Sequence, residues 1–350
     1  MDGKQHYLAL TPGKLAGLLQ ITDASGRFKV LALDQSNSFR KSLKAMHVRL
    51  GDGIEPGYEE IRDAKLEIAT VLGGYASAVL LDVNYGARQA VAAGAIPRGV
   101  GLLVRVEASR DPGIAGEVEP GWGVAKIKRM GASAVKLLVY TDIEDAAAMD
   151  AQMKFVQQIQ NDCTANDILL LVEELSYPKK GEEKKTPAYV ARRPNNILES
   201  AKRIGPFCDV LKLEYPADLA THGEAGAAAN LTALNAAAIR PWVLLSAGEK
   251  FDTFVKQVES AMKAGASGIM AGRAIFNEYF EESTAAARRK FLETTGIERM
   301  KILTAIVDRH AVPWMTRYGI RNEDLAAAVK PDWYQVGLAA APSPQSKGEY

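Results

Sequence analysis

The stretch "CDVLKLEYPAD", residues Cys208 to Asp218, is a short apolar run of the kind that forms a buried strand, yet it carries a lysine near its middle. Val210, Lys212 and Glu214 stand at alternate positions and therefore share one face of that strand. A lone buried ammonium is costly, and a buried lysine loses its charge readily. Lys212 therefore needs either an ion-pair partner or a chemical role.

Seven further runs resemble this one and alternate with longer helical patterns. The eight predicted strands are Phe28 to Asp34, Ser77 to Val83, Gly99 to Glu107, Ala134 to Tyr140, Ile168 to Tyr177, Asp209 to Tyr215, Trp242 to Gly248 and Ser267 to Ala274. Helices are expected over Tyr58 to Leu72, Trp122 to Met130, Ile143 to Gln160, Asn195 to Ile204, Gly226 to Ala238, Asp252 to Ala264 and Ala285 to His310. Eight mostly apolar strands alternating with helices favour a single α/β (β/α)8 TIM barrel over a doubly wound open sheet.

The barrel domain is expected over residues 1–318, with an extra C-terminal helix. Residues 319–350 are expected to form an extension that is partly disordered, because it ends in "AAAPSPQSKGEY". The stretch "YPKKGEEKKTPAYVARRP", residues 177–194, is expected to be a long charged loop. It is either a solvated excursion or a flap that closes over a substrate.

Composition excludes several classes of partner. The 350 residues include 43 basic and 42 acidic side chains, without the basic stripe of a nucleic-acid binder. No apolar run has transmembrane length, and residues 1–20 lack a signal-peptide pattern, so no membrane partner is expected. Cys163 and Cys208 lack metal or redox spacing and fit a reducing cytoplasm. The sequence leaves the oligomeric state open, with a homo-oligomer as one alternative.

Metal chemistry has little support in the sequence. None of the four histidines ends a predicted strand or lies near another histidine, so no zinc site and no cofactor are expected. A carboxylate site for Mg²⁺ stays open.

Polar residues gather at the ends of the predicted strands, where barrel enzymes carry their chemistry. They are Asp34, Gln35, Asp82, Arg105, Glu107, Glu173, Lys212, Glu214, Ser246, Gly248, Gly272 and Arg273. Lys136 lies deeper in its strand, and two adjacent lysines suit Schiff-base chemistry, because a neighbouring cation and burial lower the pKa of an amine. The alternative is that each lysine forms a structural ion pair with a buried glutamate. Alternation does not decide whether Glu173 or Glu174 faces inward.

The last two strands end in small residues and one cation. Ser246, Gly248 and Gly272 expose backbone N–H groups, and Arg273 adds a planar guanidinium. Loops after the seventh and eighth strands of a barrel often bind phosphate, although the glycines alone could serve only tight turns.

At these residues the sequence resembles the class I tagatose-1,6-bisphosphate aldolases and their relatives that cleave 6-deoxy-6-sulfofructose 1-phosphate. The resemblance covers roughly Leu31 to Tyr318 and rests on the ordered fragments "ALDQS", "YASAVLLDVNYG", "GASAVKLLVYTD", "LVEELSYP", "DVLKLEYP", "PWVLLSAG" and "AGASGIMAGRAIF". It implies a (β/α)8 barrel in which Lys212 forms the Schiff base, Lys136 is a second lysine near the substrate and Glu173 is the inward acid/base.

The resemblance also implies binding roles. It assigns Asp34 and Gln35 to the dihydroxyacetone hydroxyls, and Ser246, Gly248, Gly272 and Arg273 to the 1-phosphate. Arg105 and Glu107, in "LLVRVEASR", depart from the family pattern and leave recognition of carbons four to six open. Arg105 is a further candidate for substrate binding.

The resulting prediction is a class I aldolase that cleaves a phosphorylated ketose, namely tagatose 1,6-bisphosphate, to dihydroxyacetone phosphate and glyceraldehyde 3-phosphate. Cleavage of sulfofructose 1-phosphate is the alternative within the family. Two other classes remain open: a phosphate-binding isomerase that abstracts a proton with Glu173, and a non-catalytic sugar-phosphate sensor.

Overall fold

Eight parallel strands close into a barrel. The computed structural model describes residues 10–321 and residue 325, and β1 pairs with both β2 and β8, so the sheet has no free edge. The strands are β1 (Phe28–Leu33), β2 (Ala78–Leu81), β3 (Gly101–Arg105), β4 (Ala134–Thr141), β5 (Leu169–Ser176), β6 (Val210–Leu213), β7 (Trp242–Leu245) and β8 (Gly268–Ala271). All eight predicted strands and the (β/α)8 architecture are confirmed, and the open sheet is excluded.

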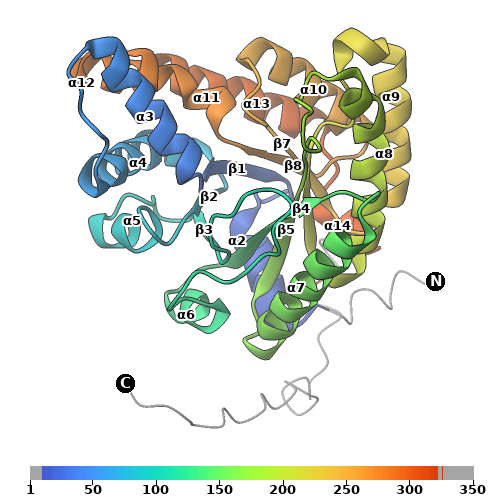
Figure 1. Ribbon diagram of the computed structural model, residues 1–350. Coiled ribbons are helices and arrows are strands. Elements are labelled where there is room, and N and C mark those ends of the chain that lie inside the picture. Colours follow the sequence, from blue (N-terminus) through green and yellow to red (C-terminus); the bar gives the residue numbers. More distant parts are fainter. Residues whose placement is uncertain (1–9, 322–324, 326–350) are drawn as a thin grey trace.

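Helices surround this barrel (Figure 1). They are α2 (Pro12–Ile21), α3 (Asn37–Leu50), α4 (Tyr58–Leu72), α5 (Ala87–Ala93), α6 (Val124–Arg129), α7 (Ala146–Ala165), α8 (Pro187–Ile204), α9 (Leu219–Ala237), α10 (Phe251–Ala264), α11 (Arg273–Phe276), α12 (Ala285–Phe291), α13 (Ile297–His310) and α14 (Trp314–Arg317). Every predicted helix is present, and a π turn at Leu292–Gly296 joins α12 to α13. The helices α2, α3, α5, α11 and α14 were not predicted.

Alternate residues of each strand face opposite cores. In β5, Leu169 and Leu171 belong to the apolar cluster inside the barrel, whereas Leu170 and Val172 belong to the cluster between the sheet and the helices. The same period continues into the polar strand ends, because side chains alternate along a strand. Glu173 therefore follows the inward set.

The amino-terminal end of the barrel is sealed by segments from both ends of the chain. Leu18 and Ile21 of α2 pack with Trp314, Met315 and Tyr318 in the same cluster as the inward strand residues. The opposite, carboxyl end is the only end of the barrel interior that stays open to a ligand among the described residues.

The charged stretch at 177–194 is only partly a loop, so that prediction needs correction. Helix α8 begins at Pro187, and Pro194 lies inside it. Proline suits the first turn of a helix because its missing N–H has no partner there in any case. Arg193 then reaches back to the carbonyl of Tyr215 at 3.1 Å, which ties α8 to the end of β6.

The predicted extension at 319–350 lies outside the described residues, apart from residues 319–321 and 325.

Candidate active site

The polar strand ends surround one cavity of about 450 Å³ at the carboxyl end of the barrel. Nine of the ten candidate residues line it, namely Asp34, Gln35, Arg105, Lys136, Glu173, Lys212, Ser246, Gly272 and Arg273. Gly248 does not line the cavity itself and lies directly behind Arg273. Parallel strands in a closed barrel deliver their carboxyl ends to one place, which explains this convergence.

Lys136 and Lys212 meet at one oxygen of Glu173. Their Nζ atoms lie 2.8 and 2.9 Å from Oε2 of that glutamate. The strand register accounts for part of this geometry, because Glu173 on β5 stands directly beside Lys212 on β6. Lys212 is 3% exposed and faces the cavity with this single carboxylate as its ion-pair partner among the described residues.

Lys136 has a different environment, with three carboxylates around it. Its Nζ lies 2.8 Å from Asp34, 3.0 Å from Glu107 and 2.8 Å from Glu173, and its side chain is fully buried. Burial alone would lower the pKa of Lys136, but the three carboxylates outweigh it and raise the pKa above the ordinary value. Lys136 is therefore a permanent cation beneath the cavity.

Two of the three carboxylates around Lys136, those of Asp34 and Glu107, have pKa values shifted in opposite directions. Burial would raise the pKa of Asp34, yet the charges of Lys136, Lys212 and Arg105 outweigh it and hold that pKa below its ordinary value. For Glu107, burial prevails over the same kind of attraction and raises its pKa. Glu107 thus belongs to the site, although sequence reasoning noted it only as a charged strand end.

Glu174 faces away from the cavity. One of its oxygens accepts hydrogen bonds from Thr141 Oγ1 at 2.7 Å and Ser176 Oγ at 3.1 Å, behind the sheet. Burial, and then the neighbouring charge of Glu214, raises the pKa of Glu174 to about 8. Only Glu173 of the two adjacent glutamates is available to a ligand in the barrel.

The ends of β7 and β8 form a cradle around an unpaired guanidinium. Gly248 has φ +83°, and a Cβ built there would lie 3.1 Å from Cζ of Arg273, so a side chain at 248 would displace the arginine. The N–H of Gly272 points to Ser246 Oγ at 3.3 Å. Among the described residues no carboxylate pairs with Arg273, and burial lowers its pKa despite the charges of Glu173 and Asp34.

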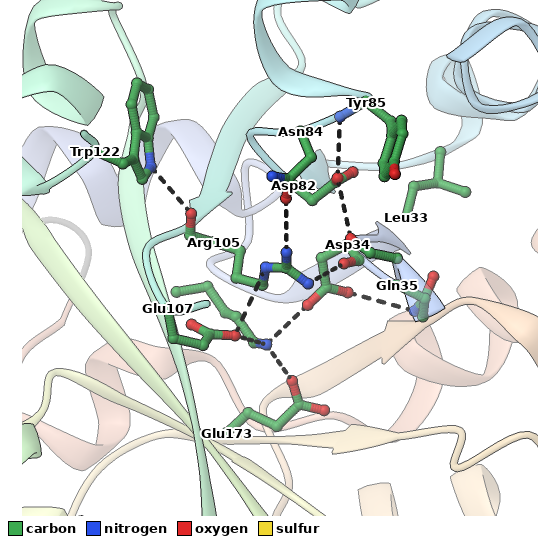
Figure 2. A network of polar contacts seen from close by, with 12 residues as sticks. Leu33, Asp34, Gln35, Asp82, Asn84, Tyr85, Arg105, Glu107, Trp122 and Glu173 are labelled. Carbon is green, nitrogen blue, oxygen red and sulfur yellow. Dashed lines mark hydrogen bonds and ion pairs between the residues drawn. The ribbon is translucent and has the colours of Figure 1, made fainter. Parts of the chain in front are cut away.

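Arg105 bridges the loops that follow β1 and β2. Figure 2 shows its guanidinium between Asp34, Asn84 and Glu107. The guanidinium donates to the carbonyl of Asp34 at 3.0 Å and to Oδ1 of Asn84 at 3.1 Å. The backbone carbonyl of Arg105 accepts a hydrogen bond from Trp122 Nε1 at 3.2 Å. Arg105 therefore fixes the backbone that carries Asp34.

A buried ion pair supports the same loops from outside the barrel. Lys65 of α4 binds Asp82 and donates to the carbonyl of Leu33 at 2.9 Å. Asp82 in turn accepts from Ser36 Oγ at 3.2 Å and from the N–H of Tyr85 at 3.1 Å. Sequence reasoning missed Lys65, although its place on the apolar face of a predicted helix was a usable signal, because a buried lysine requires a partner.

The described residues offer neither a metal centre nor a membrane-spanning helix. No group of three or more His, Cys, Asp or Glu side chains is arranged to hold a metal ion within the described part of the chain. No helix there is both long and apolar enough to cross a membrane. The cytoplasmic location, a homo-oligomer and the lack of a nucleic-acid partner stay predictions.

The fold and the site together define a (β/α)8-barrel enzyme with paired lysines and a shared carboxylate in its cavity. The family model described as "DeoC/LacD family aldolase" matches residues 29–278. The chain belongs to this family and is therefore an aldolase, which is a lyase.

Relatives of known name span nearly the whole chain. The tagatose 1,6-diphosphate aldolase of Listeria monocytogenes is 30% identical, and the alignment covers 89% of this chain and 96% of that protein. The tagatose 1,6-diphosphate aldolase of Lactococcus lactis is 29% identical, with 88% of this chain and 99% of that protein covered.

Solved structures match in fold. An archaeal fructose 1,6-bisphosphate aldolase is 17% identical with a TM-score of 0.55, and the match covers 83% of this chain and 98% of that one. The fructose-bisphosphate aldolase of Plasmodium falciparum is 11% identical with a TM-score of 0.61, covering 89% of this chain and 96% of that one.

Proposed function

We propose that this aldolase works through a Schiff base on Lys212 and cleaves tagatose 1,6-bisphosphate to dihydroxyacetone phosphate and glyceraldehyde 3-phosphate. The observation that carries the mechanism is the contact of Lys212 Nζ with Glu173 Oε2 at 2.9 Å inside the cavity. The substrate is proposed from the relatives, which are named as tagatose 1,6-diphosphate aldolases.

Lys212 is the better nucleophile of the two lysines. A nucleophilic amine must be neutral, and Lys136 is held as a cation by three carboxylates. Lys212 transfers its proton to Glu173 and attacks the carbonyl at carbon two to form a carbinolamine. Glu173 returns that proton to the carbinolamine hydroxyl, which leaves as water, so a protonated imine forms and Glu173 is again a carboxylate. Lys136 keeps a fixed positive charge beside Glu173 and orients that carboxylate.

Cleavage then proceeds with the imine as electron sink. Glu173 takes the proton of the hydroxyl on carbon four, the bond between carbons three and four breaks, and the aldehyde leaves. The electron pair of that bond forms an enamine on Lys212. Protonation at carbon three and hydrolysis release dihydroxyacetone phosphate and regenerate the amine.

The phosphate of carbon one is proposed to bind Arg273 and the backbone around Ser246, Gly248 and Gly272. An unpaired guanidinium suits a phosphate, because it can donate two parallel hydrogen bonds. Anchoring the phosphate there would hold carbon two against Lys212, which makes the attack effectively intramolecular.

The test is to trap the imine. Borohydride added with dihydroxyacetone phosphate should inactivate the enzyme irreversibly, and peptide mass analysis should find the adduct on Lys212. Lys212→Arg should fold and bind phosphate but form no adduct, because guanidinium stays protonated. An adduct on Lys136 would reverse the two lysines, and turnover without any adduct would favour proton abstraction by Glu173.

A side-by-side assay decides the substrate. Tagatose 1,6-bisphosphate should be cleaved with a higher kcat/KM than fructose 1,6-bisphosphate and 6-deoxy-6-sulfofructose 1-phosphate. A preference for the sulfonate would assign the protein to the alternative activity within the family.

A further inference from the structure

Arg105 and Glu107 each carry one buried polar atom without a hydrogen-bond partner among the described residues. Arg105 is 6% exposed and Glu107 5% exposed, and both line the cavity. The two Nη atoms of Arg105 donate to Asp34 and Asn84, whereas its Nε has no hydrogen-bond acceptor among the described residues. Oε1 of Glu107 accepts from Lys136, whereas its Oε2 has no donor there. Buried polar atoms of this kind normally have partners.

The spacing of the two side chains fits one bridging atom. Nε of Arg105 lies 4.0 Å from Oε1 of Glu107, which is too long for a direct hydrogen bond. Two atoms that each bind one shared oxygen at about 2.9 Å are separated by roughly 4 to 5.5 Å. An oxygen placed between the guanidinium and the carboxylate can therefore accept from Nε of Arg105, and the same carboxylate offers Oε2, which has no donor among the described residues.

The chemistry of the two idle atoms selects the kind of group. Nε is a donor and needs an acceptor, whereas Oε2 is an acceptor and needs a donor. A phosphate or carboxylate would satisfy Arg105 but would meet Glu107 with like charge, and an ammonium would do the reverse. A hydroxyl accepts one hydrogen bond and donates another, so it satisfies both.

The order of the strands decides which hydroxyl is within reach. Around the barrel, the phosphate cradle on β8 and β7 is followed by Lys212 on β6, Glu173 on β5, Lys136 on β4 and Arg105 on β3. A ketose anchored by its 1-phosphate passes Lys212 at carbon two and Glu173 at carbon four before it reaches β3. The next hydroxyl along the chain is that of carbon five.

We infer that Arg105 and Glu107 form a hydroxyl subsite that recognises carbon five of the ketose, which is carbon two of the aldehyde product. This inference rests on the proposed function, and it makes the two residues determinants of specificity for hydroxylated aldehydes. It also implies that a phosphate is disfavoured at the end of β3, because Glu107 beside Arg105 would meet it with like charge.

The experiment runs the reaction in the direction of condensation. Dihydroxyacetone phosphate is combined with glyceraldehyde 3-phosphate or with 3-phosphooxypropanal, which lacks only the hydroxyl in question. The wild-type enzyme should prefer glyceraldehyde 3-phosphate by roughly 10- to 100-fold in kcat/KM. The reason is that 3-phosphooxypropanal lacks the hydroxyl that the charged groups of Arg105 and Glu107 would bind.

Glu107→Gln and Arg105→Lys should each reduce that preference to within about 3-fold, mostly by lowering kcat/KM for glyceraldehyde 3-phosphate. Glu107→Gln is isosteric, so it tests the inference even if Arg105→Lys does not fold. Glu259→Gln is the matched control, because Glu259 is exposed on α10, away from the cavity, and pairs with exposed Lys263.

The outcomes separate the possible failures. Wild-type condensation without discrimination, or variants that keep the full preference, would overturn the inference alone. Variants that lose activity equally with both aldehydes would make Arg105 and Glu107 supports for Asp34 and Lys136, and would also overturn it. A wild-type enzyme that forms no Schiff base and condenses neither aldehyde would overturn the proposed function and this inference together.

Discussion

Lys136 and Lys212 bind the same oxygen of Glu173, at 2.8 and 2.9 Å, but only Lys136 has two further carboxylates. The shared oxygen brings two amines of different character to one point of the cavity. Lys136 lies among three carboxylates, which stabilise its positive charge. Lys212 faces the cavity with Glu173 as its one ion-pair partner in the described part of the chain, and this difference separates the proposed electrostatic and nucleophilic roles.

The unequal environments predict unequal losses of stability. Lys136→Met removes the cation shared by three buried carboxylates, of which Glu173 keeps Lys212 at 2.9 Å and Glu107 keeps Arg105 at 4.0 Å, and should lower the free energy of unfolding by about 3–5 kcal/mol. Lys212→Met carries the same change in side chain but leaves Glu173 paired with Lys136, so its loss should be smaller. Urea unfolding at neutral pH measures both, and equal losses would contradict the asymmetry.

The phosphate cradle predicts a binding defect. Arg273→Ala removes a charge-assisted contact of about 1.5–3 kcal/mol, so the affinity for dihydroxyacetone phosphate should fall by roughly 10- to 100-fold. Calorimetric titration measures this, with Arg289→Ala as control, because exposed Arg289 pairs with Glu293 away from the cavity. Unchanged affinity in Arg273→Ala would move the phosphate elsewhere.

Metal removal should leave the reaction intact. The imine on Lys212 and the fixed charge of Lys136 would supply the positive charge that a metal ion supplies in other aldolases. Cleavage should therefore persist after exhaustive dialysis against a chelator. Loss of activity that a divalent ion restores would refute the Schiff-base assignment.

Glu174 predicts a pH dependence of stability. Its pKa is about 8 in the folded protein, against an ordinary value of 4.5. Between these pH values the folded state keeps a proton that the unfolded state has lost, so the free energy of unfolding falls as pH rises and levels off above about 8.

Glu174→Gln mimics the protonated form and should remove this slope. The variant should therefore gain stability relative to wild type between pH 5 and pH 8, as measured by urea unfolding at both values. Glu259→Gln, on the exposed face of α10, should follow the wild-type slope. Parallel curves for Glu174→Gln and wild type would show that Glu174 is ionised in the folded protein.

Local sequence determined the strands, most of the helices and the barrel. A run such as Val210 to Leu213 is apolar apart from Lys212, and this pattern depends only on nearest neighbours along the chain. Because side chains alternate, the same pattern also indicated that Lys212 shares a face with Val210. Eight such runs allow few arrangements other than a closed barrel.

Tertiary structure decided which of these polar residues touch one another. Alternation left Glu173 and Glu174 equivalent, and only the closed barrel turns Glu173 toward Lys136 and Lys212. Arg105 and Asn84 meet because consecutive strands end side by side, and Lys14 of α2 meets Asp209 across 195 positions of sequence. Strand formation is a local preference, whereas an ion pair depends on distances that exist only after the barrel has closed.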